Sequence, residues 1–156
     1  MFDEKRALEY IASCDDVEKV RSIARKTNGK YDGIERAALR RVVALESKGT
    51  PGTVEYDCWQ MILAVEEIRR QVRGRKSPMN RLRPKIEREG ERAALEYLAL
   101  HESDGFREVL EYGLPELSAE AIVIRHGEPT FSAKALRSAR ERLENAGFDP
   151  DQNARN

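Results

Sequence analysis

Basic side chains with the chemistry to bind phosphate are concentrated in one segment, residues 69–88. These twenty residues carry nine basic side chains and one acidic one, a net charge of +8, although the whole chain is neutral. Seven of the nine are arginine, whose planar guanidinium can pair with a phosphate through two parallel hydrogen bonds. We expect eight of them to contact a phosphate backbone: Arg69, Arg70, Arg73, Arg75, Lys76, Arg81, Arg83 and Lys85.

Two arrangements can offset the self-repulsion of so much like charge. In the first, the basic side chains pair with acidic residues of the flanking segments, such as Glu55, Asp57, Glu66 and Glu67. In the second, they face outward and bind a polyanion, with release of its counterions. The arginine content and the loop-forming residues of 74–80 favour the second arrangement. The sequence leaves both open.

Two short patterns are similar to DNA-binding motifs. Residues 73–75 (Arg-Gly-Arg) resemble the core of an AT-hook, which lies in the minor groove of A·T-rich DNA, but two residues separate them from Pro78. Residues 119–126 and 132–146 have the outline of a helix-turn-helix. The connection between them contains Glu128 and Pro129, which are unsuited to a turn that approaches DNA, so a plain helical hairpin is the simpler interpretation.

Catalytic and metal-binding patterns are absent from the sequence. His101 and His126 have no partner at ligand spacing, and the chain contains no glycine-rich phosphate loop. Cys14 and Cys58 belong to no CxxC pair and are expected to be small buried apolar residues. We therefore predict no cofactor and no metal site. A helical enzyme whose site combines His126 with carboxylates distant in sequence is kept as a third hypothesis.

The elements that position the basic segment are predicted to be helices. Apolar residues recur at three- and four-residue steps along almost the whole chain, which is typical of amphipathic helices. The fold class is therefore all-α, a compact multi-helix bundle of about eight or nine helices. The longest helix, about 53–73, is expected to be central. Its predicted buried stripe consists of Val54, Cys58, Ile62, Val65, Ile68 and Val72.

Residues 1–148 are predicted to form one helical domain, with a possible sub-division near 74–80 and a flexible tail at 149–156. No secretory signal and no apolar stretch of membrane-spanning length is present. We therefore expect a cytoplasmic protein that does not bind membranes.

The leading functional hypothesis is a small, non-catalytic protein that contacts the backbone of DNA or RNA through residues 69–88. No aromatic residue lies between Trp59 and Tyr97, so we expect strong salt dependence and no base stacking. The alternative is an interaction adaptor that uses the same segment against an acidic protein, or one that self-associates as a homodimer.

Overall fold

The helices of this protein begin and end at the capping residues that its sequence supplies. The computed structural model describes residues 2–153, and within that range the chain is all-α. Asp3, Asp16, Thr53, Ser118 and Ser132 each accept a hydrogen bond from a backbone N–H in the first turn of the helix that follows. The helices are α1 (Glu4–Ser13), α2 (Val17–Thr27), α3 (Asp32–Glu46), α4 (Val54–Arg73), α5 (Leu82–Glu89), α6 (Glu91–Leu100), α7 (Asp104–Glu111), the 3-10 turn η1 (Pro115–Leu117), α8 (Ala119–His126), α9 (Ala133–Asn145) and α10 (Pro150–Asn153).

The chain divides into two compact units between Ser47 and Lys48. In the first unit, α3 packs against both α1 and α2. Its core includes Ile11, Val20 and Ile34, each almost completely shielded from solvent. These three residues come one from each helix, so the first unit has an apolar core of its own.

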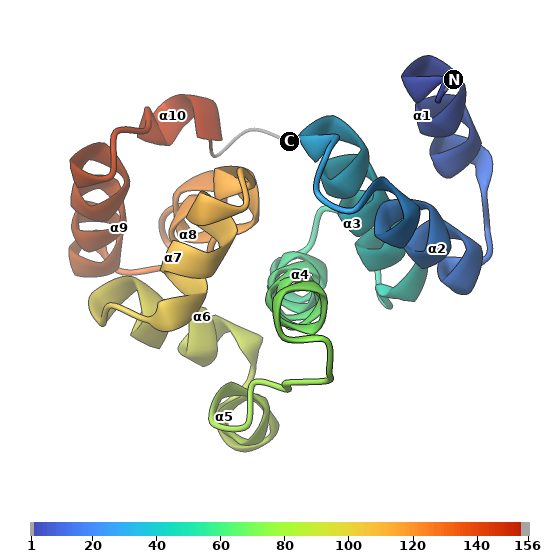
Figure 1. Cartoon of the computed structure of the whole chain (residues 1–156). Coiled ribbons are helices and arrows are strands. Elements are labelled where there is room, and N and C mark those ends of the chain that lie inside the picture. Colours follow the sequence, from blue (N-terminus) through green and yellow to red (C-terminus); the bar gives the residue numbers. More distant parts are fainter. Residues whose placement is uncertain (1, 154–156) are drawn as a thin grey trace. The chain divides into compact units, whose positions relative to one another are not determined.

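The second unit contains α4 to α10, arranged around α8 (Figure 1). Helix α8 packs against α4, α6 and α9, while α5 packs against α6. One core joins Ile62 of α4, Ile86 of α5, Leu95 of α6 and Ile122 of α8. Helices on both sides of residues 74–80 therefore share this core, and the division of the chain lies at 47/48 rather than at 74–80.

Two local details differ from the sequence-based prediction. Val72, assigned to the buried stripe of the longest helix, is 75% exposed, because the core contacts of α4 end one turn earlier at Ile68. Residues 150–153 of the predicted flexible tail form α10, and residues 154–156 of that tail lie outside the described residues.

None of the described helices combines the length and the apolar character needed to cross a membrane. Cys14 and Cys58 are both free thiols and both buried, as predicted.

Truncating the shared core should destabilise the protein. Leu95 is fully buried, so Leu95→Ala removes apolar contacts and leaves a cavity, and we expect the free energy of unfolding to fall by about 2–5 kcal/mol. The control is Val72→Ala, which truncates an exposed side chain and should change stability by less than about 0.5 kcal/mol. Urea denaturation measures both values, and equal losses in the two variants would contradict this assignment of the core.

Candidate nucleic-acid interface

The basic segment occupies the end of α4, an irregular turn and the whole of α5 (Figure 1). Helix α4 ends at Gly74, which has a φ of 73° in the left-handed region where a residue without Cβ is favoured. The chain then runs without regular structure until α5 begins at Leu82. The sequence-predicted residues thus come from three consecutive pieces of backbone.

Glu66 of α4 fixes the path of this turn. Its Oε2 accepts hydrogen bonds from the backbone N–H of Met79 at 2.9 Å and from Nε of Arg83 at 2.8 Å, and its Oε1 accepts one from Nη2 of Arg83 at 2.6 Å. Burial raises the pKa of Glu66, but these bonds and the nearby positive charges of Arg83 and Arg69 outweigh burial and hold the pKa below its ordinary value. The carboxylate therefore ties α4, the turn and α5 together.

Two further residues of the predicted set are paired within the protein. Nε and Nη2 of Arg69 donate to the two carboxylate oxygens of Glu108 on α7, at 2.9 and 2.8 Å. Lys85 pairs with Glu89 at 2.8 Å, one turn further along α5. With Arg83, this makes three of the eight predicted contact residues whose charge is already met by a carboxylate.

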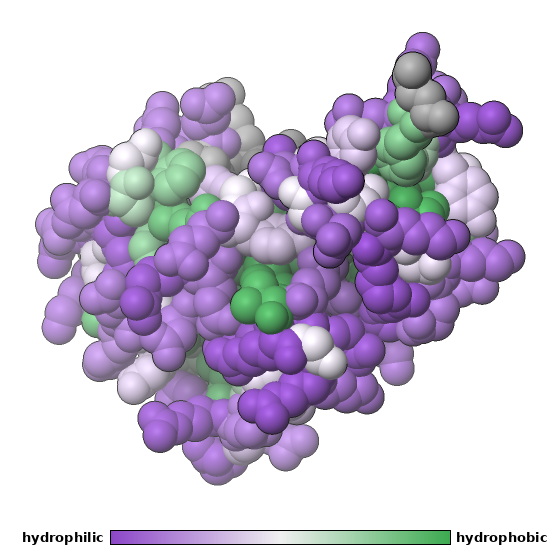
Figure 2. Space-filling model, viewed as in Figure 1, coloured by the Kyte–Doolittle hydropathy of each residue, from purple (hydrophilic) through white to green (hydrophobic). Residues whose placement is uncertain are grey.

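The other five have no carboxylate within 4.0 Å among residues 2–153. The guanidinium of Arg73 donates to the hydroxyl of Ser77 at 2.5 Å, and Arg70 is half-buried. Four are exposed, as is Arg88, a basic residue outside the predicted set that also has no ion pair in the described chain. Figure 2 shows a surface covered almost entirely by hydrophilic residues where α5 lies. The five unpaired residues of the predicted set are Arg70, Arg73, Arg75, Lys76 and Arg81.

A groove of about 780 Å³ is lined by one of these five cations, Arg81, and by Arg88; we call it the α5 groove. Its lining comes from the end of α4, the turn, α5, the end of α6 and the start of α7. Two acidic residues, Glu102 and Asp104, line it at the α6–α7 connection. Its basic lining residues are Arg69, Arg81, Lys85, Arg88 and Arg107.

Aromatic rings lie beside the basic segment in the fold, although none lies between Trp59 and Tyr97 in the sequence. The guanidinium carbon of Arg83 lies 5.3 Å from the ring centroid of Trp59, and Nζ of Lys85 lies 4.6 Å from that of Tyr97. Tyr97 also lines the α5 groove and is 46% exposed. Folding brings the ring of Trp59 on α4 and the ring of Tyr97 on α6 close to α5. The spacing of these residues in the sequence does not show that they are close in space.

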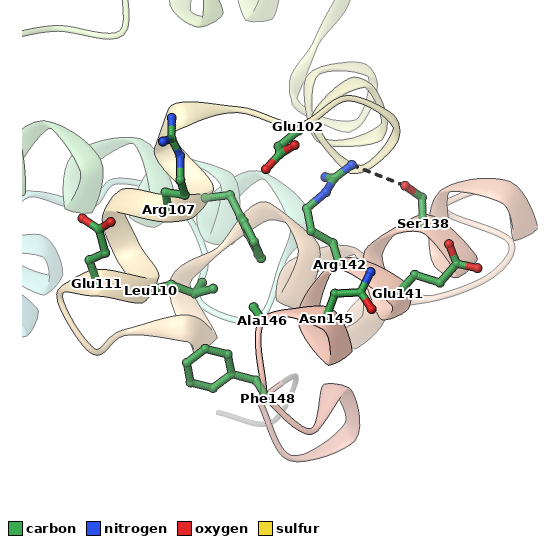
Figure 3. Close-up of a pocket in the computed structure, with 11 residues that line it drawn as sticks. Glu102, Arg107, Leu110, Glu111, Ser138, Glu141, Arg142, Asn145, Ala146 and Phe148 are labelled. Atoms are coloured by element: carbon green, nitrogen blue, oxygen red, sulfur yellow. Dashed lines mark hydrogen bonds between the residues drawn. The ribbon is translucent and has the colours of Figure 1, made fainter.

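A second pocket, of about 590 Å³, lies between α7 and α9 (Figure 3). Leu110, Ala146 and Phe148 gather along one side of it. Three acidic residues and two basic ones, Arg107 and Arg142, also line it. Because its acidic residues outnumber its basic ones, this pocket is less suited to a polyanion than the α5 groove.

Arg142 is already committed to internal partners. It forms an ion pair with Glu120, which is 1% exposed, and donates to the carbonyl of Leu98 at 2.9 Å. Burial raises the pKa of Glu120, and the pairing with Arg142 acts in the opposite direction. This pair compensates the charge of a buried carboxylate between α8 and α9, and its role is structural.

His126, the residue of the third hypothesis, is also held by internal partners. Its Nε2 lies 2.7 Å from Oδ2 of Asp57, a buried carboxylate that also accepts from Nη1 of Arg125 at 3.1 Å. The neighbouring Cys58 is fully buried, and burial together with nearby carboxylates raises its pKa to about 12. The Cys58 thiol is therefore protonated at neutral pH. Within residues 2–153 no three His, Cys, Asp or Glu side chains form a group suited to a metal ion.

Comparison with known proteins gives no relative: no protein-family model matches the chain, and neither a curated protein nor a solved structure is significantly similar to it.

The Glu66 contacts give a prediction with a defined pH dependence. At pH 7, Glu66→Gln leaves a single acceptor oxygen and places an NH2 donor opposite one N–H of Arg83, so one charge-assisted hydrogen bond from Arg83 is lost and the other is weakened. We expect the free energy of unfolding to fall by about 1–2 kcal/mol. Because the pKa of Glu66 is lower in the folded state than the ordinary value of about 4.3, its contribution is complete above that pH and is lost as the pH falls through the folded-state pKa.

The difference between the wild type and Glu66→Gln should therefore shrink below about pH 4. Urea denaturation at pH 7 and at pH 3 measures it. Glu87→Gln is the matched control, because Glu87 is an exposed residue of α5 without an ion pair in the described chain, and its substitution should leave stability unchanged. A loss in Glu66→Gln that is the same at both pH values would refute the assigned role of the carboxylate.

Proposed function

We propose that this protein is a non-catalytic binding protein that contacts the phosphate backbone of nucleic acid through the turn between α4 and α5 and through α5 itself. The observation that carries the proposal is the set of exposed cations that find no carboxylate within the described chain. They are Arg73, Arg75, Lys76, Arg81 and Arg88.

The internal ion pairs support this proposal because they show which cations serve the fold and which remain available to bind a phosphate. Arg69 and Arg83 each form a two-point pair with a carboxylate and anchor the segment to α7 and α4. The turn that carries Arg75 and Lys76 is thereby held in place without using either side chain. A preorganised set of cations loses less conformational entropy when it binds phosphate than a flexible tail would.

Two of the predicted contact residues therefore have a changed role in the proposal. Arg69 and Arg83 position the surface rather than neutralise phosphates, and Arg88 joins the residues that do. Contacts to phosphate carry no sequence information, so the binding is expected to depend strongly on salt and weakly on sequence.

A binding experiment tests the proposal directly. We expect a labelled duplex of mixed sequence to shift in fluorescence anisotropy on addition of the protein at 50 mM salt. If the five exposed cations of the proposal, Arg73, Arg75, Lys76, Arg81 and Arg88, each neutralise one phosphate, the logarithm of the binding constant should fall against the logarithm of salt concentration with a slope of about −4.5.

The sharpest variant replaces four unpaired cations with alanine: Arg73, Arg75, Lys76 and Arg81. The salt dependence of its binding should be much weaker, with a slope of about −1 in place of about −4.5. Its stability should not fall, because the removed side chains have no carboxylate partner in the described structure and repel one another. Arg83 is left intact because its removal would leave Glu66 without its partner.

The matched control removes the same amount of charge from other helices. Arg25, Lys26, Lys134 and Arg137 are exposed basic residues of α2 and α9, and their replacement by alanine should leave the slope near that of the wild type. No shift at 50 mM salt, or an equal loss in both variants, would overturn the proposal. Competition by polyglutamate as effective as competition by DNA would favour the alternative, an acidic protein partner.

A further inference from the structure

The lining of the α5 groove includes an exposed aromatic ring and two cations without ion pairs in the described chain, Arg81 and Arg88. Tyr97 lies near the end of α6, lines the groove and is 46% exposed. Its ring stacks on that of His101, with the centroids 4.2 Å apart and the planes at 24°. Nδ1 of His101 lies 3.0 Å from the carbonyl oxygen of Tyr97, which holds the imidazole in this position. The groove therefore has a supported aromatic platform.

The contact of Lys85 with Tyr97 is of a kind that a ligand can replace. Its ammonium group lies 4.6 Å from the ring centroid and also pairs with Glu89, whose side chain is 47% exposed. A cation–π contact with a half-exposed ring and an ion pair with such a partner each stabilise the position of Lys85 only weakly. If Lys85 moves away from Tyr97, the ring is uncovered. The ammonium group still lines the groove, where it can attract a phosphate.

The remaining lining is mostly basic. Arg81 and Arg88 line the groove without ion pairs in the described chain. The N-terminus of α5 also adjoins the groove and carries no side-chain cap, which adds partial positive charge. Glu102 and Asp104 line the groove at the α6–α7 connection, where Asp104 pairs with Arg107. Phosphates are thus favoured along α5.

We propose that the α5 groove binds single-stranded nucleic acid, with one base stacked on Tyr97 and the adjoining phosphates on Arg81 and Arg88. The volume of about 780 Å³ falls in the range of pockets that enclose small organic ligands, and so can hold a nucleotide. The bases of a duplex are stacked inside the helix and cannot reach Tyr97. This inference rests on the proposed function and adds to it a preference for single strands.

The experiment compares two probes and three variants at 50 mM salt. The probes are labelled oligodeoxythymidylate of 12 nucleotides, which forms no duplex, and a labelled 12-base-pair duplex. We expect Tyr97→Ala to weaken binding of the single strand at least about fivefold, because one base–aromatic stack is lost. The same variant should bind the duplex as the wild type does. Tyr97→Phe keeps the ring and should retain the affinity for the single strand.

Tyr10→Ala is the matched control for exposure. Tyr10 lies on α1 and is 46% exposed, the same fraction as Tyr97, and its truncation should alter neither probe. Thermal unfolding shows whether each variant is folded as the wild type is.

The outcomes separate the two proposals. If neither probe binds, the proposed function itself fails, and this inference fails with it. If both probes bind and Tyr97→Ala leaves single-strand binding unchanged, or weakens both probes equally, the base platform is overturned while backbone binding stands. A selective loss for the single strand, rescued by phenylalanine, supports the inference.

Discussion

The Glu66 carboxylate is the interaction on which the basic surface depends. It lies on α4 and accepts hydrogen bonds from the backbone of Met79 and from the guanidinium of Arg83. One half-buried group thereby fixes the turn and the start of α5 with three donors. Without it, Arg83 would lose its carboxylate partner and keep only the contact with the ring of Trp59 on α4. The turn would also lose the hydrogen bond that holds Met79.

Folding sorts the cations of residues 69–88 by the neighbours that each position acquires. Arg69 and Arg83 face carboxylates on packed helices, whereas Arg75, Lys76 and Arg81 lie on the exposed turn, where the described chain places no acidic side chain. The carboxylate partners lie on packed helices, on α4 for Arg83 and α7 for Arg69, or one turn along the same helix for Lys85. The irregular turn offers neither arrangement. Within residues 69–88, some cations therefore pair with carboxylates of the same chain, while others close by in the sequence face outward without such a partner.

The helices could be predicted largely from the sequence because their signals are local. Apolar spacing and capping residues such as Thr53 and Ser132 depend only on the next few positions. The prediction failed for Val72, since periodicity continues to the end of a helix even where no neighbouring helix covers it. The boundary at 47/48 was missed for a related reason: which helices share a core is a property of packing, and residues 74–80 look like a linker without being one.

The sequence by itself determined the all-α fold class, the helix ends and the concentration of positive charge, because each follows from residues close together in the chain. The tertiary structure decided which cations are paired, since Glu66 and Glu108 lie 17 and 39 positions from Arg83 and Arg69. It also brought Tyr97 to Lys85. Ion pairs and ring contacts act over a few ångströms in space, and only packing determines which residues distant in sequence come that close.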